Sequence, residues 1–375
     1  MSGLPAEAYA AALAGFDEMT LHRLRALLMR HSPAEAWEVA QGRAASGGLV
    51  AKVLAEPKVR SAWATSAAAR PPEQVWARCC ELGLAVHLHG SAGYPHLLAH
   101  DLLPPPVLFS QGDLGLLEGR RVAVVGTRNA TASGRSAATR LGADLAASGV
   151  HVVSGLARGI DGATHRGVLG ACGEGRPVGV VACGLDVVYP REHHRLWNDV
   201  ATTGLLLSEY PPGAAPLPYR FPQRNRIVAA LAELVVVVES RERGGSLVTV
   251  GAALDRGVPV MAMPGSSLNR AARGVNELLR DGAAPALDAD DVLLALQLGP
   301  RVGSSSEVAE LRPRPAPADI AVYRVLERQP LTLDGVAEVS TMSMVEAAMS
   351  LARLSNAGWV ASADGWFECV GSPLS

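Results

Sequence analysis

The sequence contains almost no lysine, and this scarcity limits what its basic residues can mean. Lysine occurs only at Lys52 and Lys58, although lysine and arginine together number 34 in 375 residues. An arginine excess beside abundant alanine is what a GC-rich coding bias produces, so the arginine count alone is weak evidence for nucleic-acid binding. The formal net charge is -2, from 34 basic and 36 acidic residues, which excludes a surface that is basic overall. Any nucleic-acid footprint must therefore be local.

Disulfide and membrane signals are also missing. The five cysteines form no C-x-x-C pair and are odd in number, which predicts reduced packing thiols in a cytosolic protein. No apolar run reaches membrane-spanning length, and the N-terminus lacks the basic start and long apolar core of a signal peptide. We therefore expect a cytoplasmic protein without a membrane partner.

The fingerprints of dinucleotide and metal binding are absent too. A dinucleotide fold has the pattern G-x-G-x-x-G after its first strand, whereas this chain has Gly126-Thr127-Arg128-Asn129 and its next glycine at Gly134. Arg128 would occupy space that a pyrophosphate needs. His87 and His89 alternate as strand neighbours, but no third ligand follows at a recognisable spacing. We expect neither a cofactor nor a bound metal.

From Arg121 onward, apolar segments of strand length alternate with segments of helical periodicity. The strands are apolar throughout, which is typical of strands covered on both faces. This order predicts an α/β fold with a Rossmann-like, doubly wound, mostly parallel sheet, which binds ligands beyond the carboxyl ends of its strands. The predicted strands are 121–126, 151–154, 177–182, 204–209, 234–239 and 259–265, with helices at about 132–147, 160–169, 192–200, 225–231 and 246–254.

Both ends of the chain differ from this middle part. Residues 1–70 are alanine-rich with apolar positions at helical spacing and a capped helix start at Ser32-Pro33-Ala34-Glu35, so they predict a small helical domain. Residues 301–318 have the composition of a linker after a Rossmann-like domain at 71–300. Residues 319–375 predict three helices and a hairpin, in an order that resembles a winged helix-turn-helix.

The charge is distributed unevenly along the chain. Residues 120–170 carry seven arginines and two acidic residues, a local charge of +5. Residues 303–375 carry five arginines and nine acidic residues, a local charge of -4. Phosphate binding should therefore be a property of the middle segment, whereas contact with a partner or packing is the better interpretation of the last one.

Three short segments near strand ends combine glycines and arginines. They are residues 126–128, 154–161 and 221–226, the last predicted as a loop ahead of the strand at 234–239. Glycine lets the backbone approach a ligand closely, and arginine supplies a fixed fork of donors that matches phosphate oxygens. The three segments together predict an anion-binding mouth.

The third segment carries the strongest signal for nucleic acid. In Arg224-Asn225-Arg226, two arginines could clamp successive phosphates while the amide reads a base edge or a turn, and Phe221 could stack on an unpaired base. A solvated helix start explains the same residues equally well. Gly245 and Ser246 head a later helix, where free backbone N–H groups bind anions.

Asp161 and His165 lie four residues apart on a predicted helix and therefore share one face. They could form an acid/base pair or a metal pair. No serine or cysteine nucleophile with a fixed partner is evident, which favours a structural role in which Asp161 caps the helix and His165 hydrogen-bonds to it. We therefore expect no catalytic residue.

Taken together, several motifs resemble the DprA (Smf) family of bacterial DNA-processing proteins. The motifs cover about residues 91–284 in unbroken order, and the outer parts resemble the sterile-alpha-motif and winged-helix types. They are GYPHLL, PPPVLFSQGDL, VVGTR, SGLARGIDGATH, CGLDVVYP, LLSEYPPG, FPQRNRI, VVVVESRERGGSLVT, and MPG with the later RGVNELL.

The resemblance implies a homodimer without catalysis that binds single-stranded DNA in natural transformation, protects incoming strands from nucleases and helps to load the RecA recombinase. The stacking and helix-start arguments above add Phe221, Gly245 and Ser246 to the expected DNA contacts. Gly245 stands where the family usually has serine. By position, the resemblance assigns DNA contact to Gly126, Thr127, Arg128, Ser154, Gly155, Arg158, Arg224, Asn225 and Arg226.

A different class of function also has a counterpart in the sequence. A nucleotide-hydrolysing N-glycosidase of the lysine-decarboxylase-like Rossmann group would carry the hallmark P-G-G-x-G-T-x-x-E. Residues 244–249 read GGSLVT at the comparable turn, without the glutamate. We keep this enzyme as the alternative to a binding protein.

Overall fold

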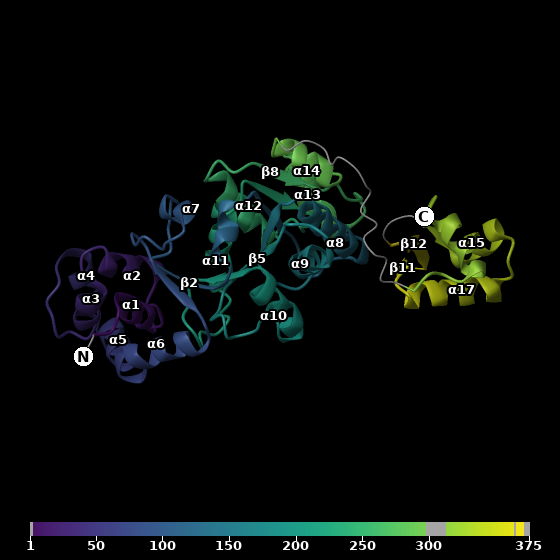
Figure 1. Cartoon of the computed structure of the whole chain (residues 1–375). Helices are drawn as coiled ribbons and strands as arrows, with labels where there is room; N and C mark the ends of the chain where they lie inside the picture. Colours follow the sequence, from purple (N-terminus) through teal and green to yellow (C-terminus); the bar gives the residue numbers. More distant parts are fainter. Residues whose placement is uncertain (1–2, 298–312, 364, 371–375) are drawn as a thin grey trace.

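A mostly parallel sheet forms the middle of the molecule (Figure 1). The computed structural model describes residues 3–297, 313–363 and 365–370, and nine strands of this part form one sheet in the order β1-β2-β6-β5-β4-β3-β7-β8-β9. The strands are β1 (Ala85–Leu88), β2 (Val107–Gly112), β3 (Arg121–Val125), β4 (His151–Ser154), β5 (Pro177–Val181), β6 (Leu205–Ser208), β7 (Leu234–Val237), β8 (Val260–Ala262) and β9 (Ala284–Pro285).

The strand order confirms the predicted doubly wound fold. The chain builds β3, β4, β5 and β6 side by side in one direction, then returns to place β7 and β8 on the other side of β3, all in parallel. The order of strands therefore reverses between β3 and β7, and in such sheets this is where ligands bind. Two strands of the sheet were not predicted, β2 and the two-residue β9. β2 follows three prolines that indicate a loop, and it pairs antiparallel with β6.

Helices cover both faces of the sheet, which explains why its strands are apolar throughout. In β3, Val122 and Val124 pack into one apolar cluster and Ala123 and Val125 into another, on opposite faces. One face is covered by α8 (Ala132–Ala147), α9 (Ile160–Gly170) and α14 (Ala289–Ala295), and the other by α7 (His96–Ala99), α11 (Arg220–Ala230), α12 (Ser246–Leu254) and α13 (Arg273–Arg280).

The N-terminal residues are helical, as predicted, and the capping box of Ser32 and Glu35 is present. One buried apolar cluster runs from these helices across residue 70 into the sheet, joining Leu13 and Trp63 to Phe109 and to residues of α10 (His194–Thr203). The N-terminal helices and the sheet thus share one core. The helices are α1 (Ala6–Ala14), α2 (Leu21–Leu28), α3 (Pro33–Ala40), α4 (Gly48–Ala55), α5 (Pro57–Ala69) and α6 (Pro72–Glu81).

The C-terminal residues form a unit with its own core, drawn in yellow in Figure 1. Its order of helix, strand, helix, helix, strand, strand resembles that of a winged helix-turn-helix, and its three strands pair in the order β10-β12-β11. Most of the predicted linker lies outside the described residues. The first helix of the C-terminal unit begins at Pro317, two residues before the predicted start of this domain at Asp319. The elements are α15 (Pro317–Leu326), β10 (Leu331–Thr332), α16 (Leu333–Ser340), α17 (Met344–Asn356), β11 (Val360–Ala363) and β12 (Trp366–Cys369).

The third predicted loop is wrong, because residues 221–226 belong to a helix. Helix α11 begins at Arg220, five residues earlier than the predicted start at Asn225. Pro222 lies in the first turn, where backbone N–H groups have no partner within the helix, so its missing N–H costs nothing there. In residues 3–297 and 313–370, apart from residue 364, no helix is long and apolar enough to cross a membrane.

An ion pair between buried Asp319 and half-exposed Arg353 should contribute to the stability of the C-terminal unit. Arg353 of α17 donates from Nε and Nη2 to the carboxylate of Asp319 on α15, at 3.0 and 2.7 Å, and Ser350 donates to it at 2.6 Å. These bonds hold the pKa of Asp319 below its usual value. We expect Asp319→Asn to lower the free energy of unfolding of this unit by about 1–2 kcal/mol. The expected loss is kept small because Arg353 is half exposed and solvent weakens the ion pair.

Urea unfolding of the full chain at several pH values would measure this loss. A carboxylate with a lowered pKa stabilises the fold above its ordinary pKa of 3.8, and the contribution disappears as the pH falls below that value. The two proteins should therefore converge in acid. Asp334→Asn, which removes an exposed carboxylate from α16, is the charge-matched control. Equal stability of Asp319→Asn and Asp334→Asn at neutral pH would contradict the assignment.

Candidate functional site

A cavity of about 540 Å³ lies beyond the carboxyl ends of β3 and β4, at the point where the strand order reverses. The first turns of α11 and α12 close its other side. The predicted site residues among its lining are Gly126, Thr127, Arg128, Gly155, Phe221, Arg224, Asn225, Gly245 and Ser246. The structure therefore brings together residues from all three predicted segments and from the start of α12.

The loop after β3 is held by close packing at Gly126. A Cβ atom at this position would lie 2.8 Å from Cβ of Ile160 and 2.9 Å from the carbonyl oxygen of Glu239, so only glycine fits. Thr127 donates its backbone N–H to the same carbonyl oxygen at 2.7 Å. The carboxyl ends of β3 and β7 are thereby locked together, and Arg128 is carried to the rim of the cavity.

Asp161 and Arg224 form the floor of the cavity. Both are buried, Gly155 donates its backbone N–H to Asp161 Oδ2 at 3.1 Å, and Arg224 donates to the carbonyl oxygen of Val180. Burial raises the pKa of Asp161, and the positive charge of Arg224 opposes this effect. Asp161 is thus structural, as predicted, but it orients the loop at Gly155 rather than capping α9, whose N-cap is Gly159.

The predicted hydrogen bond from His165 to Asp161 is wrong, since none joins them in the described part of the chain. His165 is completely buried, and burial lowers its pKa to about 3. The imidazole is therefore neutral near pH 7 and has no charge to pair with the carboxylate. A metal role for the two residues also lacks a geometric basis, because the described residues contain no metal-binding group of three or more His, Cys, Asp or Glu.

Arg226 does not reach the cavity. Its guanidinium pairs with the Glu209 carboxylate, and both side chains are only 9% exposed. Burial raises the pKa of Glu209, and Arg226 opposes this effect. On one turn of α11, Arg224 and Asn225 face the cavity and Arg226 faces the protein interior. The interpretation of Arg224 and Arg226 as two equivalent phosphate clamps must be revised.

Ser154 and Arg158 also lie outside the cavity lining. Ser154 is buried and donates its hydroxyl to the carbonyl oxygen of Val124 at 2.6 Å, which ties the end of β4 to β3. Arg158 is exposed and pairs with Glu192 at 2.5 Å. Of the three arginines predicted in the second and third segments, only Arg224 lines the cavity.

Aromatic rings and an arginine form one wall of the mouth. The Cζ atom of Arg128 lies 4.5 Å from the ring centroid of Phe221, which is a cation–π contact, and the Phe221 ring lies 5.5 Å from that of Tyr189. Tyr189 is 40% exposed and was missed in the sequence. It follows the strand at 177–181 inside the motif CGLDVVYP, so its place after a strand end was the available signal.

The opposite wall is the start of α12. Gly245 is its N-cap residue, the first turn carries no acidic side chain, and Asn225 donates to the carbonyl oxygen of Gly245 at 3.2 Å. Arg241 and Arg243, just before this helix, are exposed lining residues that the sequence reasoning also missed. With Arg128 and Arg224, four arginines and one acid, Asp161, line the cavity, a local charge of +3. Such a mouth suits an anion.

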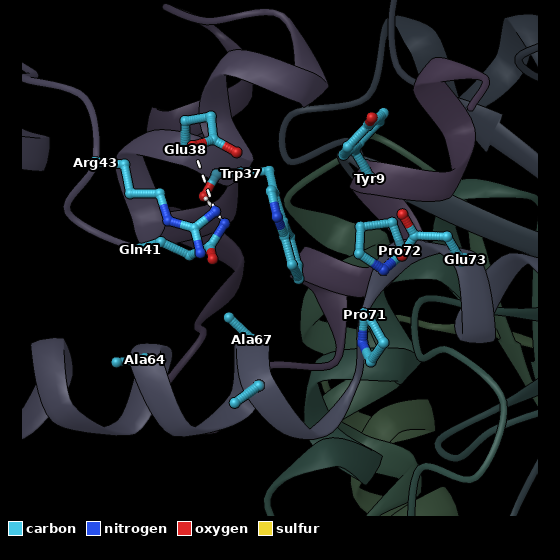
Figure 2. A pocket seen from close by; sticks show the side chains of 11 residues that line it. Tyr9, Trp37, Glu38, Gln41, Arg43, Ala64, Ala67, Pro71, Pro72 and Glu73 are labelled. Atoms are coloured by element: carbon cyan, nitrogen blue, oxygen red, sulfur yellow. Dashed lines mark hydrogen bonds and ion pairs between the residues drawn. The ribbon is translucent and has the colours of Figure 1, made fainter. Parts of the chain in front are cut away.

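A larger cavity of about 650 Å³ lies elsewhere, among the N-terminal helices (Figure 2). The Trp37 ring stands between Tyr9 and the paired Glu38 and Arg43, whose charged atoms are 3.7 Å apart. No predicted site residue lines this cavity, and its lining contains both acidic and basic side chains. Size alone therefore does not identify the functional site.

The buried pair of Arg226 and Glu209 predicts a pH-dependent defect. In the variant Arg226→Met, Glu209 loses its ion-pair partner. We expect the free energy of unfolding to fall by about 3 kcal/mol at slightly alkaline pH. A buried carboxyl with a raised pKa stabilises the fold most below its ordinary value of 4.5 and least above its folded pKa. The deficit should therefore shrink as the pH falls towards 4.5.

Urea titrations across this pH range would measure the deficit. The double variant Arg226→Met with Glu209→Gln leaves no buried charge and should recover most of the loss. A deficit independent of pH, or a double variant as unstable as the single one, would show that the pair does not act in this way.

Comparisons with known proteins agree with the motifs. The family model of DNA recombination-mediator protein A matches residues 85–297. DNA processing protein DprA of Bacillus subtilis is 42% identical over 203 residues, which are 54% of this chain and 68% of that protein.

Two solved structures resemble the fold. The X-ray structure of DNA processing protein A from Streptococcus pneumoniae covers 78% of this chain and 98% of its own, with a TM-score of 0.63 and 30% identity. A structure of DNA processing protein A from Helicobacter pylori, described for its single-stranded DNA binding mode, covers 57% of this chain and 95% of its own, with a TM-score of 0.51 and 29% identity. Because the family model covers more than half of the sequence, this chain belongs to the DNA recombination-mediator protein A family, the DprA (Smf) DNA-processing proteins.

Proposed function

We propose that this DNA-processing protein binds single-stranded DNA at the mouth between β3, β4 and the starts of α11 and α12. The observation that carries the proposal is the pairing of exposed arginines with an aromatic wall of half-buried Phe221 and exposed Tyr189, at the point where the strand order reverses. The related protein of Helicobacter pylori is described as binding single-stranded DNA, which supports the same ligand here.

The chemistry of the mouth favours unpaired strands over a duplex. Arg128, Arg241 and Arg243 are exposed and can neutralise phosphates. Phe221 and Tyr189 offer ring faces on which a base can stack, and only an unpaired base has its faces free. Neither group reads a base edge, so the binding should tolerate many sequences.

The predicted contact residues now divide by position. Five of them would bring backbone close to the strand, where the loops and the start of α12 line the cavity: Gly126, Thr127, Gly155, Gly245 and Ser246. Asn225 faces the same space. Arg224 lies in the floor of the cavity, where it donates to the carbonyl oxygen of Val180 and its charge offsets that of Asp161. Ser154, Arg158 and Arg226 support the site without lining it.

The wider role follows from the family resemblance. We propose that the protein acts by binding and not by catalysis, as a cytoplasmic homodimer that protects incoming DNA during natural transformation and helps to load RecA. The position of the cavity at the rim of a rigid sheet supports a role as a holder of a strand. An N-glycosidase would need a catalytic carboxylate at the mouth, and the one acidic lining residue, Asp161, is buried beside Arg224.

The first test compares two forms of DNA. We expect the full chain to bind oligo-dT more tightly than a duplex of equal length, with an affinity that falls steeply as salt rises because bound cations are released from the phosphates. Fluorescence anisotropy at several salt concentrations measures both effects. Equal or tighter duplex binding would refute the proposal. Release of free base from a nucleoside monophosphate would favour the glycosidase instead.

The second test separates the wall of the mouth from its supports. Arg128→Ala should weaken oligo-dT binding about tenfold and lower the salt slope by about one, since it removes one phosphate contact. Phe221→Leu should weaken binding by about 1–3 kcal/mol with little change in the salt slope, since it removes a stacking face. Anisotropy at matched salt concentrations measures the two effects.

Two arginine variants serve as controls for this test. Arg280→Ala removes an exposed arginine at the end of α13, outside the cavity lining, and should bind like the parent protein. Arg226→Met should alter stability but not the affinity of the folded fraction. If Arg128→Ala and Arg280→Ala bind alike, the mouth is assigned to the wrong residues.

A further inference from the structure

The second helix of the C-terminal helix-turn-helix differs from a DNA-reading helix. In DNA readers this helix lies in the major groove and presents polar and basic side chains to base edges and phosphates. Here the helix is α17, which packs Ala347, Leu351 and Leu354 into the core of the unit. Its opposite face decides what the unit can bind.

That opposite face is apolar. Val345, Met349 and Ala352 are exposed at spacings of four and three residues, so they form one stripe along α17. Val345 is 68% and Met349 is 55% exposed, and Val339 in the last turn of α16 is 55% exposed. We call the three residues of α17 the α17 stripe. Two large exposed apolar side chains, Val345 and Met349, aligned with Ala352 on a small unit are consistent with an interaction surface.

The charges around the α17 stripe exclude phosphates as its ligand. Residues 313–370 contain four arginines and seven acidic residues, a net charge of -3. The one basic residue of α17 is Arg353, and its guanidinium is bonded to Asp319. Glu338 on α16 and Glu346 on α17 are exposed. A second copy of the unit would bring like charges together, so self-association through this face is disfavoured.

We propose that the α17 stripe docks an amphipathic helix of another protein, one whose apolar positions at three- and four-residue spacing are flanked by lysine or arginine. The apolar positions would cover Val345, Met349 and Ala352, and the basic residues would meet Glu338 and Glu346. Methionine adapts its shape to a partner at little strain, which suits such a surface. The winged unit is then a protein-docking module, and DNA binding is left to the central sheet.

A synthetic peptide of 18 residues tests the proposal with the full chain. Its leucines are spaced to form one helical face, lysines fill the other positions, and a fluorophore reports binding by anisotropy. We expect saturable binding that is weakened at least about tenfold by Val345→Asn with Met349→Gln, because two apolar side chains are lost without a change in charge. A peptide with glutamate in place of lysine should bind at least about tenfold more weakly than the lysine peptide.

The control is Leu268→Gln, which replaces a 93% exposed leucine in the central part and should bind the peptide like the parent. Circular dichroism and the unfolding midpoint verify that the double variant is folded. Undiminished peptide binding by the double variant would overturn the proposal, as would equal binding of the lysine and glutamate peptides. So would a concentration-dependent dimer that the double variant abolishes, since the occupant would then be a second copy.

Discussion

The parallel pairing of β3 with β4 on one side and with β7 on the other is the constraint on which the rest of the structure depends. It places the carboxyl ends of three strands that are far apart in the sequence at one rim of the sheet. The chain then leaves each strand through a loop held by backbone contacts, at Gly126, at Gly155 and at Glu239. The mouth exists because these ends meet, and its rigidity comes from contacts too close to admit another side chain at Gly126.

Desolvation divides the arginines around the mouth into two groups. Arg224 and Arg226 are buried, and each is placed where an acidic residue compensates its charge, Asp161 for the first and Glu209 for the second. Arg128, Arg241 and Arg243 remain exposed, and their charge is available to a ligand. The buried set therefore shapes the mouth, and the exposed set leaves positive charge at its surface.

The central sheet and the C-terminal unit present different side chains on the outer faces of their helices. In the central part, the starts of α11 and α12 line a cavity together with Arg128, Arg224, Arg241 and Arg243. In the C-terminal unit, α17 turns an apolar face outward and commits its one arginine to an internal ion pair. The same helical periodicity thus puts arginines at a cavity in one place and an apolar stripe on the surface in the other, according to which residues occupy the outer face.

The sequence by itself determined the class of fold, the order of the central strands and helices, and the segments that meet at the mouth. Strands such as β3 and β7 can be recognised from their apolar runs alone. A parallel sheet then gathers the carboxyl ends of its strands at one edge. Only the tertiary structure decided which neighbours within a segment face the ligand. Arg224 and Arg226 are two residues apart on a helix whose start the sequence suggested was a loop. Their different surroundings arise from Asp161 and Glu209, which no local pattern connects to them. Tyr189 joined the wall for the same reason, since it meets Phe221 only through the packing of distant segments.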